Sequence, residues 1–318
     1  MGGLLKEVTD VRVFVPPSFE GVMSVVVLEE ILKEGTTLDV QYTSSLDFRE
    51  YIHSDLTDST TSIFLGLPYR GYALPDDFYI MNDVPFSDFI HISTYGEQIK
   101  GDHIVSLVEP EKDPIKVLYQ AIQNNPSSFI LSDVVELTDK AYYFVEAVNA
   151  YRTWSWENND TTRMLLALYH ASYKRLPNLV RGLSLQEVVR KYAPIIKGQM
   201  EKMDDYINRK IATSREVYVD IEGQSCILKV VYADEYINEV ANRLLQPQAP
   251  TPTIACVGRA TKGGDIFSIR TDKVDAGKVA YLLNGGGGKD TVASVFSGVS
   301  YAELMSNSFK VRLDEAYI

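Results

Sequence analysis

Four consecutive glycines followed by a lysine are the sharpest chemical signal in the sequence. They are Gly285, Gly286, Gly287, Gly288 and Lys289. Because glycine has no Cβ, a ligand can approach the backbone amides of this run closely. We also predict that a helix begins in Thr291–Phe296. Amides beside a helix start and a lysine suit an anion such as phosphate. The run is not a Walker A loop, because Asp290 stands where that loop has its magnesium-binding Ser or Thr. A turn without any ligand is the alternative interpretation.

The segment around the glycines is basic in a chain that is otherwise acidic. The formal net charge of the protein is −12. Between residues 254 and 289 the cations outnumber the acids, which are Asp265, Asp272 and Asp275. The cations are Arg259, Lys262, Arg270, Lys273, Lys278 and Lys289. This local reversal of charge supports an anion site.

Length and composition define the class of protein. A chain of 318 residues suggests about two domains, and 45% hydrophobic with 23% charged residues is ordinary for a globular protein. The negative net charge argues against a surface that coats duplex DNA. No apolar run reaches the length of a membrane span and no signal-peptide pattern is present, so we expect a cytoplasmic protein without a membrane partner. Cys226 and Cys256 have no metal-ligand spacing and are expected to be core thiols.

The elements that must position these residues alternate between strand and helix in the first half of the chain. Short apolar runs predict five strands: Val11–Val15, Leu38–Tyr42, Ser62–Leu67, Phe89–Ser93 and Ile104–Val108. Helical spacing predicts four helices: Gly21–Leu32, Pro114–Ile122, Val134–Val148 and Thr161–Tyr173. Strands separated by helices of this length indicate βαβ units and a mostly parallel sheet.

A long amphipathic segment then leads to a second region of different composition. Ser184 and Glu187 have the spacing of a capping box and open a helix, which Pro194 and Gly198 are expected to kink or divide. Beyond it the sequence predicts a hairpin, a helix at Asp234–Leu245, two further strands, and a helix at Val274–Leu283. We therefore expect an α/β protein with a first domain over residues 1–180, a helical connector over 181–213 and a smaller α/β domain over 214–318.

The C-terminal region resembles the DHH-associated domain. In that domain a strand ending in Arg-Ser is followed by a helix and then by Gly-Gly-Gly-Gly-His. Here Phe267–Thr271 reads Phe-Ser-Ile-Arg-Thr, and the glycine run ends in Lys289 in place of the histidine. The resemblance implies that Arg270 and the run Gly285–Gly288 hold a substrate phosphate and a terminal nucleotide. Lys289 still provides a cation but has no imidazole chemistry.

The resemblance to DHH-family phosphoesterases extends to the first domain, chiefly to the nanoRNase branch. Pro16–Gly21 takes the place of His-Asn-Asp-Leu-Asp-Gly after the first strand, and Tyr151–Trp156 is similar to Tyr-Asp-Thr-Trp-Glu-Trp. Family members use aspartates and histidines to hold two metal ions that activate water against a phosphodiester. The positions that match those ligands are Pro16, Ser18, Glu20, Gly66, His91 and Arg152.

Most of these positions have lost the ability to bind a metal ion. Only Glu20 and His91 retain ligand atoms, and an arginine cannot coordinate a divalent cation. We therefore expect an inactive phosphoesterase-like protein without a cofactor, which binds an oligonucleotide or a phosphate-bearing nucleotide. Two alternatives stay open. One is a scaffold or inhibitor that keeps the fold for a protein partner, and the other is a divergent phosphodiesterase that uses manganese or magnesium.

Overall fold

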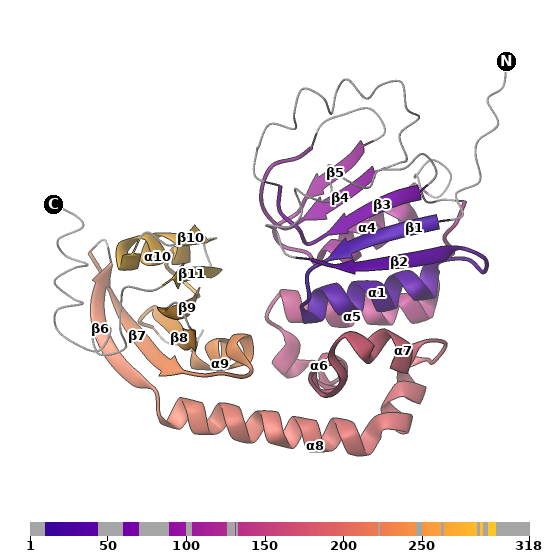
Figure 1. Ribbon diagram of the computed structural model, residues 1–318. Helices are drawn as coiled ribbons and strands as arrows, with labels where there is room; N and C mark the ends of the chain where they lie inside the picture. Colours follow the sequence, from indigo (N-terminus) through magenta and orange to yellow (C-terminus); the bar gives the residue numbers. More distant parts are fainter. Residues whose placement is uncertain are drawn as a thin grey trace. The chain divides into compact units, whose positions relative to one another are not determined.

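The computed structural model describes residues 10–43, 60–69, 89–99, 104–125, 131, 133–221, 223–245, 250–261, 264–284, 287–288 and 292–296. The chain divides into two compact units, Met1–Met200 and Glu201–Ile318. Figure 1 labels the helices and strands of each unit. Within the described ranges, no helix is long and apolar enough to cross a membrane.

A parallel sheet with the strand order β2-β1-β3-β4-β5 forms the centre of the first unit (Figure 1). Its strands are β1 (Asp10–Val15), β2 (Thr37–Tyr42), β3 (Thr60–Leu65), β4 (Phe89–Ser93) and β5 (Ile104–Val108). β1 lies between β2 and β3, so the winding of the chain reverses there. In open α/β sheets, ligands bind beside the carboxyl ends of the strands at such a switch point. The predicted parallel α/β architecture is confirmed.

Helices of the first unit pack against one another and against the sheet. They are α1 (Phe19–Ile31), α4 (Pro114–Asn124), α5 (Asp139–Arg152), α6 (Asp160–Ser172) and α7 (Leu176–Val180), with short 3-10 turns η1 (Trp156–Asn158) and η2 (Tyr173–Arg175). α1 and α4 contact the strands directly, and α5 packs against both helices. α5 begins later than predicted because the Thr138 side chain caps its first turn by accepting a hydrogen bond from Ala141 N. Val135, which the prediction placed in the helix, instead forms a β-bridge with Leu32.

A single helix, α8 (Leu185–Ala212), contains the boundary between the two units. Its predicted capping box is confirmed, because Ser184 N donates to Glu187 Oε2 at 2.7 Å and Glu187 N donates to Ser184 Oγ at 3.3 Å. Pro194 and Gly198 lie inside the helix without dividing it. Both are exposed, and the helix and its buried apolar face continue past them, so of the predicted kink or division the division is absent.

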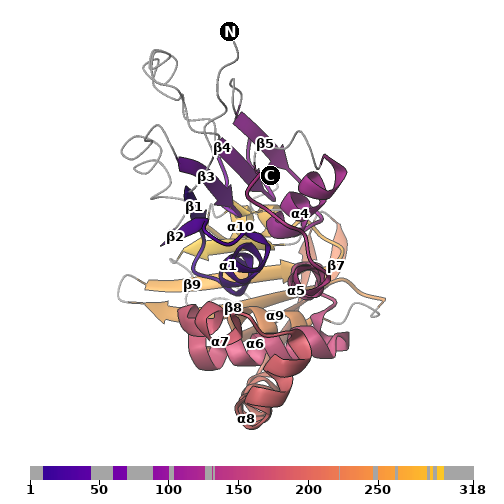
Figure 2. The same cartoon turned by 90° about the vertical axis from the view of Figure 1, so that its right-hand side faces the viewer.

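The second unit is built on a mixed sheet with the order β10-β11-β9-β8-β7-β6 (Figure 1), of which Figure 2 labels β7, β8 and β9. Its strands are β6 (Arg215–Ile221), β7 (Gln224–Tyr232), β8 (Thr253–Thr261), β9 (Gly264–Thr271), β10 (Gly287–Gly288) and β11 (Val292–Phe296). β7 and β8 are parallel and α9 (Ile237–Leu244) joins them, whereas the other described pairs are antiparallel.

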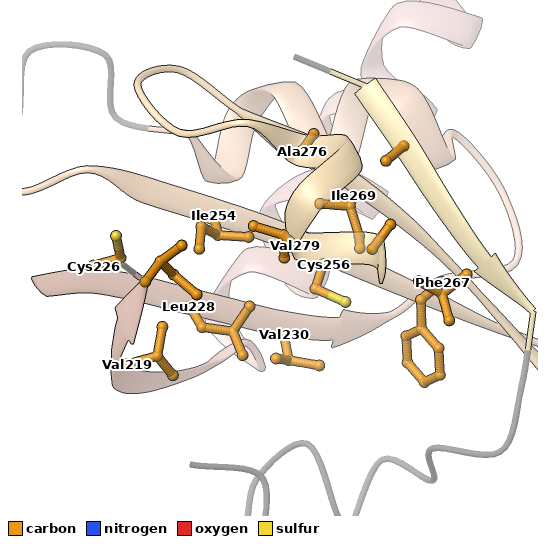
Figure 3. Packing of buried hydrophobic residues seen from close by; sticks show 14 residues of the cluster. Val219, Cys226, Leu228, Val230, Ile254, Cys256, Phe267, Ile269, Ala276 and Val279 are labelled. Atoms are coloured by element: carbon orange, nitrogen blue, oxygen red, sulfur yellow. The ribbon is translucent and has the colours of Figure 1, made fainter. Parts of the chain in front are cut away.

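The core of the second unit lies between this sheet and α10 (Ala276–Asn284) (Figure 3). Leu228, Ile254 and Phe267 come from three different strands, and Val279 of α10 packs with them. Cys256 is part of the same core, and burial raises the pKa of its thiol to about 12. The expectation of an inert core thiol therefore agrees with its surroundings.

The segment after the glycines is a strand and not the predicted helix. In β11, Ala293 and Val295 are buried whereas Ser294 is exposed, and this alternation is that of a strand with one covered face. The helix α10 precedes the glycines instead. Because a helix carries partial negative charge at its C-terminal end, the helix next to the glycine run does not favour an anion there. The prediction that a helix beginning after the glycines helps to bind an anion is therefore wrong.

Candidate functional site

The loop after β1 brings two of the predicted positions to the switch point. Ser18 caps α1, since its Oγ accepts a hydrogen bond from Gly21 N at 3.3 Å. Glu20 lies in the first turn of the same helix. A Cβ at position 21 would lie 1.9 Å from the carbonyl oxygen of Pro16, so only glycine fits there. This tight turn fixes Ser18 and Glu20 at the carboxyl end of β1.

Gly66 follows β3 and lies against the loop after β1. Its φ is +74°, in the region that favours glycine, and its amide donates to the Ile92 carbonyl at 2.8 Å. A Cβ at this position would lie 3.5 Å from Cγ and Cδ of Pro16 and 3.9 Å from Cγ of Pro114. These are ordinary van der Waals distances, so the positive φ rather than lack of space is what favours glycine at position 66.

His91 is a buried structural residue of β4. Its Nε2 donates to the Leu67 carbonyl at 2.8 Å, and its Nδ1 accepts from Ser106 Oγ at 2.9 Å. Because the Leu67 carbonyl can only accept, the ring proton lies on Nε2, and Nδ1 of the neutral ring accepts from the Ser106 hydroxyl, whose oxygen also accepts from Ile99 N at 2.9 Å. Burial lowers the pKa of His91, so the ring is neutral at pH 7. Both nitrogens are hydrogen-bonded to protein groups, so His91 has a structural role here, and its coordination of a metal ion stays a prediction.

Among the side chains that the structure describes at this edge, no arrangement fits a pair of metal ions. In the part of the chain that the structure describes, no group of three His, Cys, Asp or Glu side chains is arranged to hold a metal. Ser18 uses its oxygen as a helix cap, and Gly66 offers no side chain. Of the six positions that match metal ligands, Glu20 alone offers a carboxylate.

Arg152 places a guanidinium near this edge from the last turn of α5. Its Nη2 donates to the carbonyl oxygen of Pro110 at 3.3 Å, and its side chain is half-buried. Its charge acts on Asp113, and so does the charge of Glu20. The three ionisable groups therefore belong to one cluster at the carboxyl ends of β1 and β5.

Asp113 is a member of this cluster that the sequence analysis missed. It is fully buried and caps α4, because Oδ1 accepts from Ile115 N at 3.0 Å. Oδ2 has no hydrogen-bond partner among the described protein atoms. Burial and the charge of Glu20 raise the pKa of Asp113 to about 8, although the Ile115 amide and Arg152 act in the opposite direction. The carboxyl is therefore mostly protonated at pH 7. An Asp-Pro pair before an apolar helical pattern was the signal that could have identified this cap.

In the second unit, Arg270 lies in β9, which β11 separates from the strand β10 that carries Gly287 and Gly288. Arg270 pairs with Val292 of β11, and β11 in turn pairs with Gly287 and Gly288 of β10. Its Nη2 donates to Asn238 Oδ1 at 2.7 Å and its Nη1 to the Ile269 carbonyl at 2.8 Å. Arg270 is only 9% exposed, so part of its role is to hold the start of α9. Gly285, Gly286 and Lys289 lie outside the described residues.

Comparisons with solved structures identify the fold. The chain is similar to a pGpG-specific phosphodiesterase, PggH, from Vibrio cholerae, with 12% identity, a TM-score of 0.51, and 96% of this chain and 99% of that chain covered. It is also similar to the DHH domain of a protein assigned to a family of ribosomal proteins, with 10% identity, a TM-score of 0.56, and coverage of 98% and 87%.

A third similar structure is that of RecJ from Thermus thermophilus in complex with Mn²⁺. It shares 11% identity with this chain at a TM-score of 0.51, and the match covers 98% of this chain and 52% of RecJ. No family model and no curated protein matches the sequence. At these identities the structural likeness shows the fold alone.

Proposed function

Because the chain has the fold of the DHH-family phosphoesterases, we propose that it binds a short oligonucleotide or a phosphate-bearing nucleotide without hydrolysing it. The observation that supports the proposal is the set of side chains described at the switch point: Glu20 alone of the six matched positions has a carboxylate, Gly66 has no side chain, and both ring nitrogens of His91 are hydrogen-bonded to protein groups. One of the similar structures is a pGpG-specific phosphodiesterase, which makes a dinucleotide a suitable first ligand to test.

Arg152 provides the charge that a phosphate requires in this first unit. A guanidinium has five N–H donors in a planar fork, so the bond from Nη2 to the Pro110 carbonyl leaves donors for a phosphate. Asp113 is mostly protonated at pH 7, so it adds little negative charge beside Arg152. Glu20 remains as an opposing charge. In this proposal a guanidinium takes over the electrostatic role of a metal ion but not its activation of water.

The second unit contributes a further anion site in this proposal, formed by Arg270, the run Gly285–Gly288 and Lys289. Arg270 and the strand β10 lie on either side of β11, which supports a shared site. The hydrogen bond from Arg270 to Asn238 gives the same residue a structural role. Loss of thermal stability in Arg270→Ala without any loss of ligand affinity would assign Arg270 to structure alone. Residence in the cytoplasm also remains a proposal.

Isothermal titration calorimetry with the dinucleotide pGpG tests this function. We expect binding in EDTA and no hydrolysis when manganese or magnesium is added. Arg152→Ala should weaken binding by about 1.5–3 kcal/mol, the scale of a hydrogen bond to a charged group. Arg190→Ala is the matched control, because it removes the same charge from an exposed position on α8. Manganese-dependent cleavage that is lost in Glu20→Ala would instead establish a divergent phosphodiesterase.

A protein-binding role is the second candidate, and two exposed tyrosines favour it. Tyr142 and Tyr143 are adjacent on α5 and are 48% and 58% exposed. Tyr142 also packs near Tyr119, with ring centroids 6.3 Å apart. Exposed aromatic side chains are common at protein interfaces. Absence of any nucleotide-induced rise in the melting temperature across a nucleotide panel would favour this scaffold function.

A further inference from the structure

Two tyrosines and a lysine form a group at the β2 side of the switch-point loop. Tyr42 ends β2, whereas Tyr173 and Lys174 belong to η2. Lys174 Nζ lies 4.7 Å from the ring centroid of Tyr42 and 5.6 Å from that of Tyr173. The Tyr173 hydroxyl donates to the Pro17 carbonyl at 3.3 Å, which ties the group to the loop after β1. These side chains therefore flank the same edge of the sheet as Ser18.

Tyr173 has a backbone conformation that tyrosine rarely adopts. Its φ is +51° and its ψ is −129°, in a region that favours glycine. Tyr173 is 43% exposed, so full burial of the ring does not account for a tyrosine at this position. Residues held in such strained conformations cluster at ligand-binding and active sites. The strain therefore points to a role for the exposed ring.

A chain of buried aromatic rings packs against the ring of Tyr173. Tyr169 packs against it at a centroid distance of 5.7 Å, and Phe19 packs against Tyr169 at 5.6 Å. Phe19 also contacts Tyr151 at 4.9 Å, and Tyr151 directly precedes Arg152 in α5. One cluster of rings therefore positions both Tyr173 and the turn that carries Arg152.

The charge around this group is compatible with an anion. Glu29 is the acid that acts on Tyr42, whose pKa is raised to about 12 by burial first and by this charge second. Glu29 is ion-paired with Arg181, because Arg181 Nη2 lies 2.5 Å from Glu29 Oε1 and Nε lies 3.3 Å from Oε2. The negative charge of Glu29 is therefore balanced, and the Lys174 ammonium remains exposed beside the rings.

From this arrangement we infer that Tyr173 stacks on a nucleobase of the ligand and that Lys174 contacts the adjacent phosphate. The inference rests on the proposed function and adds to it that the base itself is recognised. Aromatic rings beside cations are the means by which proteins hold single-stranded nucleic acid. The contact of Lys174 with the rings is a weak, exposed cation–π interaction, so the ammonium can leave it for a phosphate. A ligand without a base would not use Tyr173.

Titration of five proteins with two probes tests the stacking. The proteins are the wild type, Tyr173→Gly, Tyr173→Phe, Arg152→Ala and the control Tyr218→Ala, which removes an exposed tyrosine from β6 of the second unit. The probes are pGpG and inorganic pyrophosphate, which has no base. Tyr173→Gly relieves the backbone strain but removes the packing on Tyr169 and the bond to Pro17, so the melting temperature of each variant is measured beside its affinity.

Tyr173→Gly should raise the dissociation constant for pGpG about tenfold, which corresponds to about 1.4 kcal/mol, and leave that for pyrophosphate unchanged. Tyr173→Phe keeps the ring and should bind both probes as the wild type does. If pGpG binds Tyr173→Gly as tightly as the wild type while Arg152→Ala weakens both probes, the stacking is overturned and the proposed function stands. A wild-type protein that binds neither probe overturns both.

Discussion

Replacement of Asp113 by asparagine should change how the stability of the protein depends on pH. The carboxyl is fully buried, and its pKa is about 8 in the folded protein against an ordinary value of 3.8. Between these two values the folded state keeps a proton that the unfolded chain has released. The free energy of unfolding therefore falls as pH rises, by about 1.4 kcal/mol for each pH unit from one such group, and it levels off above the folded pKa.

The variant Asp113→Asn removes this dependence and keeps the helix cap. Asparagine accepts a hydrogen bond at an N-cap about as well as aspartate, so the bond from Ile115 N can remain. Its amide is neutral at every pH. Relative to the wild type, the variant should gain roughly 3 kcal/mol of stability between pH 5 and pH 7, from two pH units of slope.

Urea unfolding at pH 5, 6 and 7 measures this difference directly. Asp139→Asn is the control, since Asp139 is an exposed acid in the first turn of α5 and its removal should leave the slope unchanged. Parallel stability curves for the wild type and Asp113→Asn would refute the reasoning, because they would mean that Asp113 is ionised in the folded protein. A steeper fall with pH in the variant would contradict it as well.

Four further substitutions test the description of the fold by thermal melting. Gly198→Ala should stabilise the protein by about 0.5–1 kcal/mol, because a Cβ meets nothing within 4 Å in α8, whereas Gly182→Ala should destabilise it because φ is +72° there. Gly258→Ala should cost roughly 1–3 kcal/mol, since its Cβ would lie 2.8 Å from Cε1 of Phe267; a neutral result would contradict the packing. Ser184→Ala should cost about 1 kcal/mol by removing the cap of α8, and an unchanged melting temperature would argue against the capping box.

The elements of the first unit could be predicted from the sequence because their signals are local. Short β-branched runs identify strands such as β1, and helical spacing identifies α1 and α4. The capping box of Ser184 and Glu187 is equally local and is confirmed. β11 was misjudged because five residues are too few to separate a helical from a strand period, and its strand form depends on pairing with β9.

The candidate site was less predictable because its properties arise from residues far apart in the sequence. His91 could be suspected as a ligand, but its partners Leu67 and Ser106 come from other parts of the sheet. The raised pKa of Asp113 depends on burial and on Glu20, which lies in a different helix. The backbone strain of Tyr173 has no signature in the sequence at all. Matching motif positions indicated which ligand residues are replaced in this chain but not what surrounds the replacements.

The burial of α1 has a consequence for synthesis on the ribosome. Ten of its thirteen residues are buried, and its partners include α5 and α7. Glu30 pairs with Lys140, and Glu29 pairs with Arg181, so the contacts of this helix span more than 100 residues of chain. At about 5–20 residues per second, α1 emerges roughly 7–30 s before α7 is complete. During that interval an apolar helix is exposed, so a chaperone that shields the nascent chain should raise the yield of folded protein.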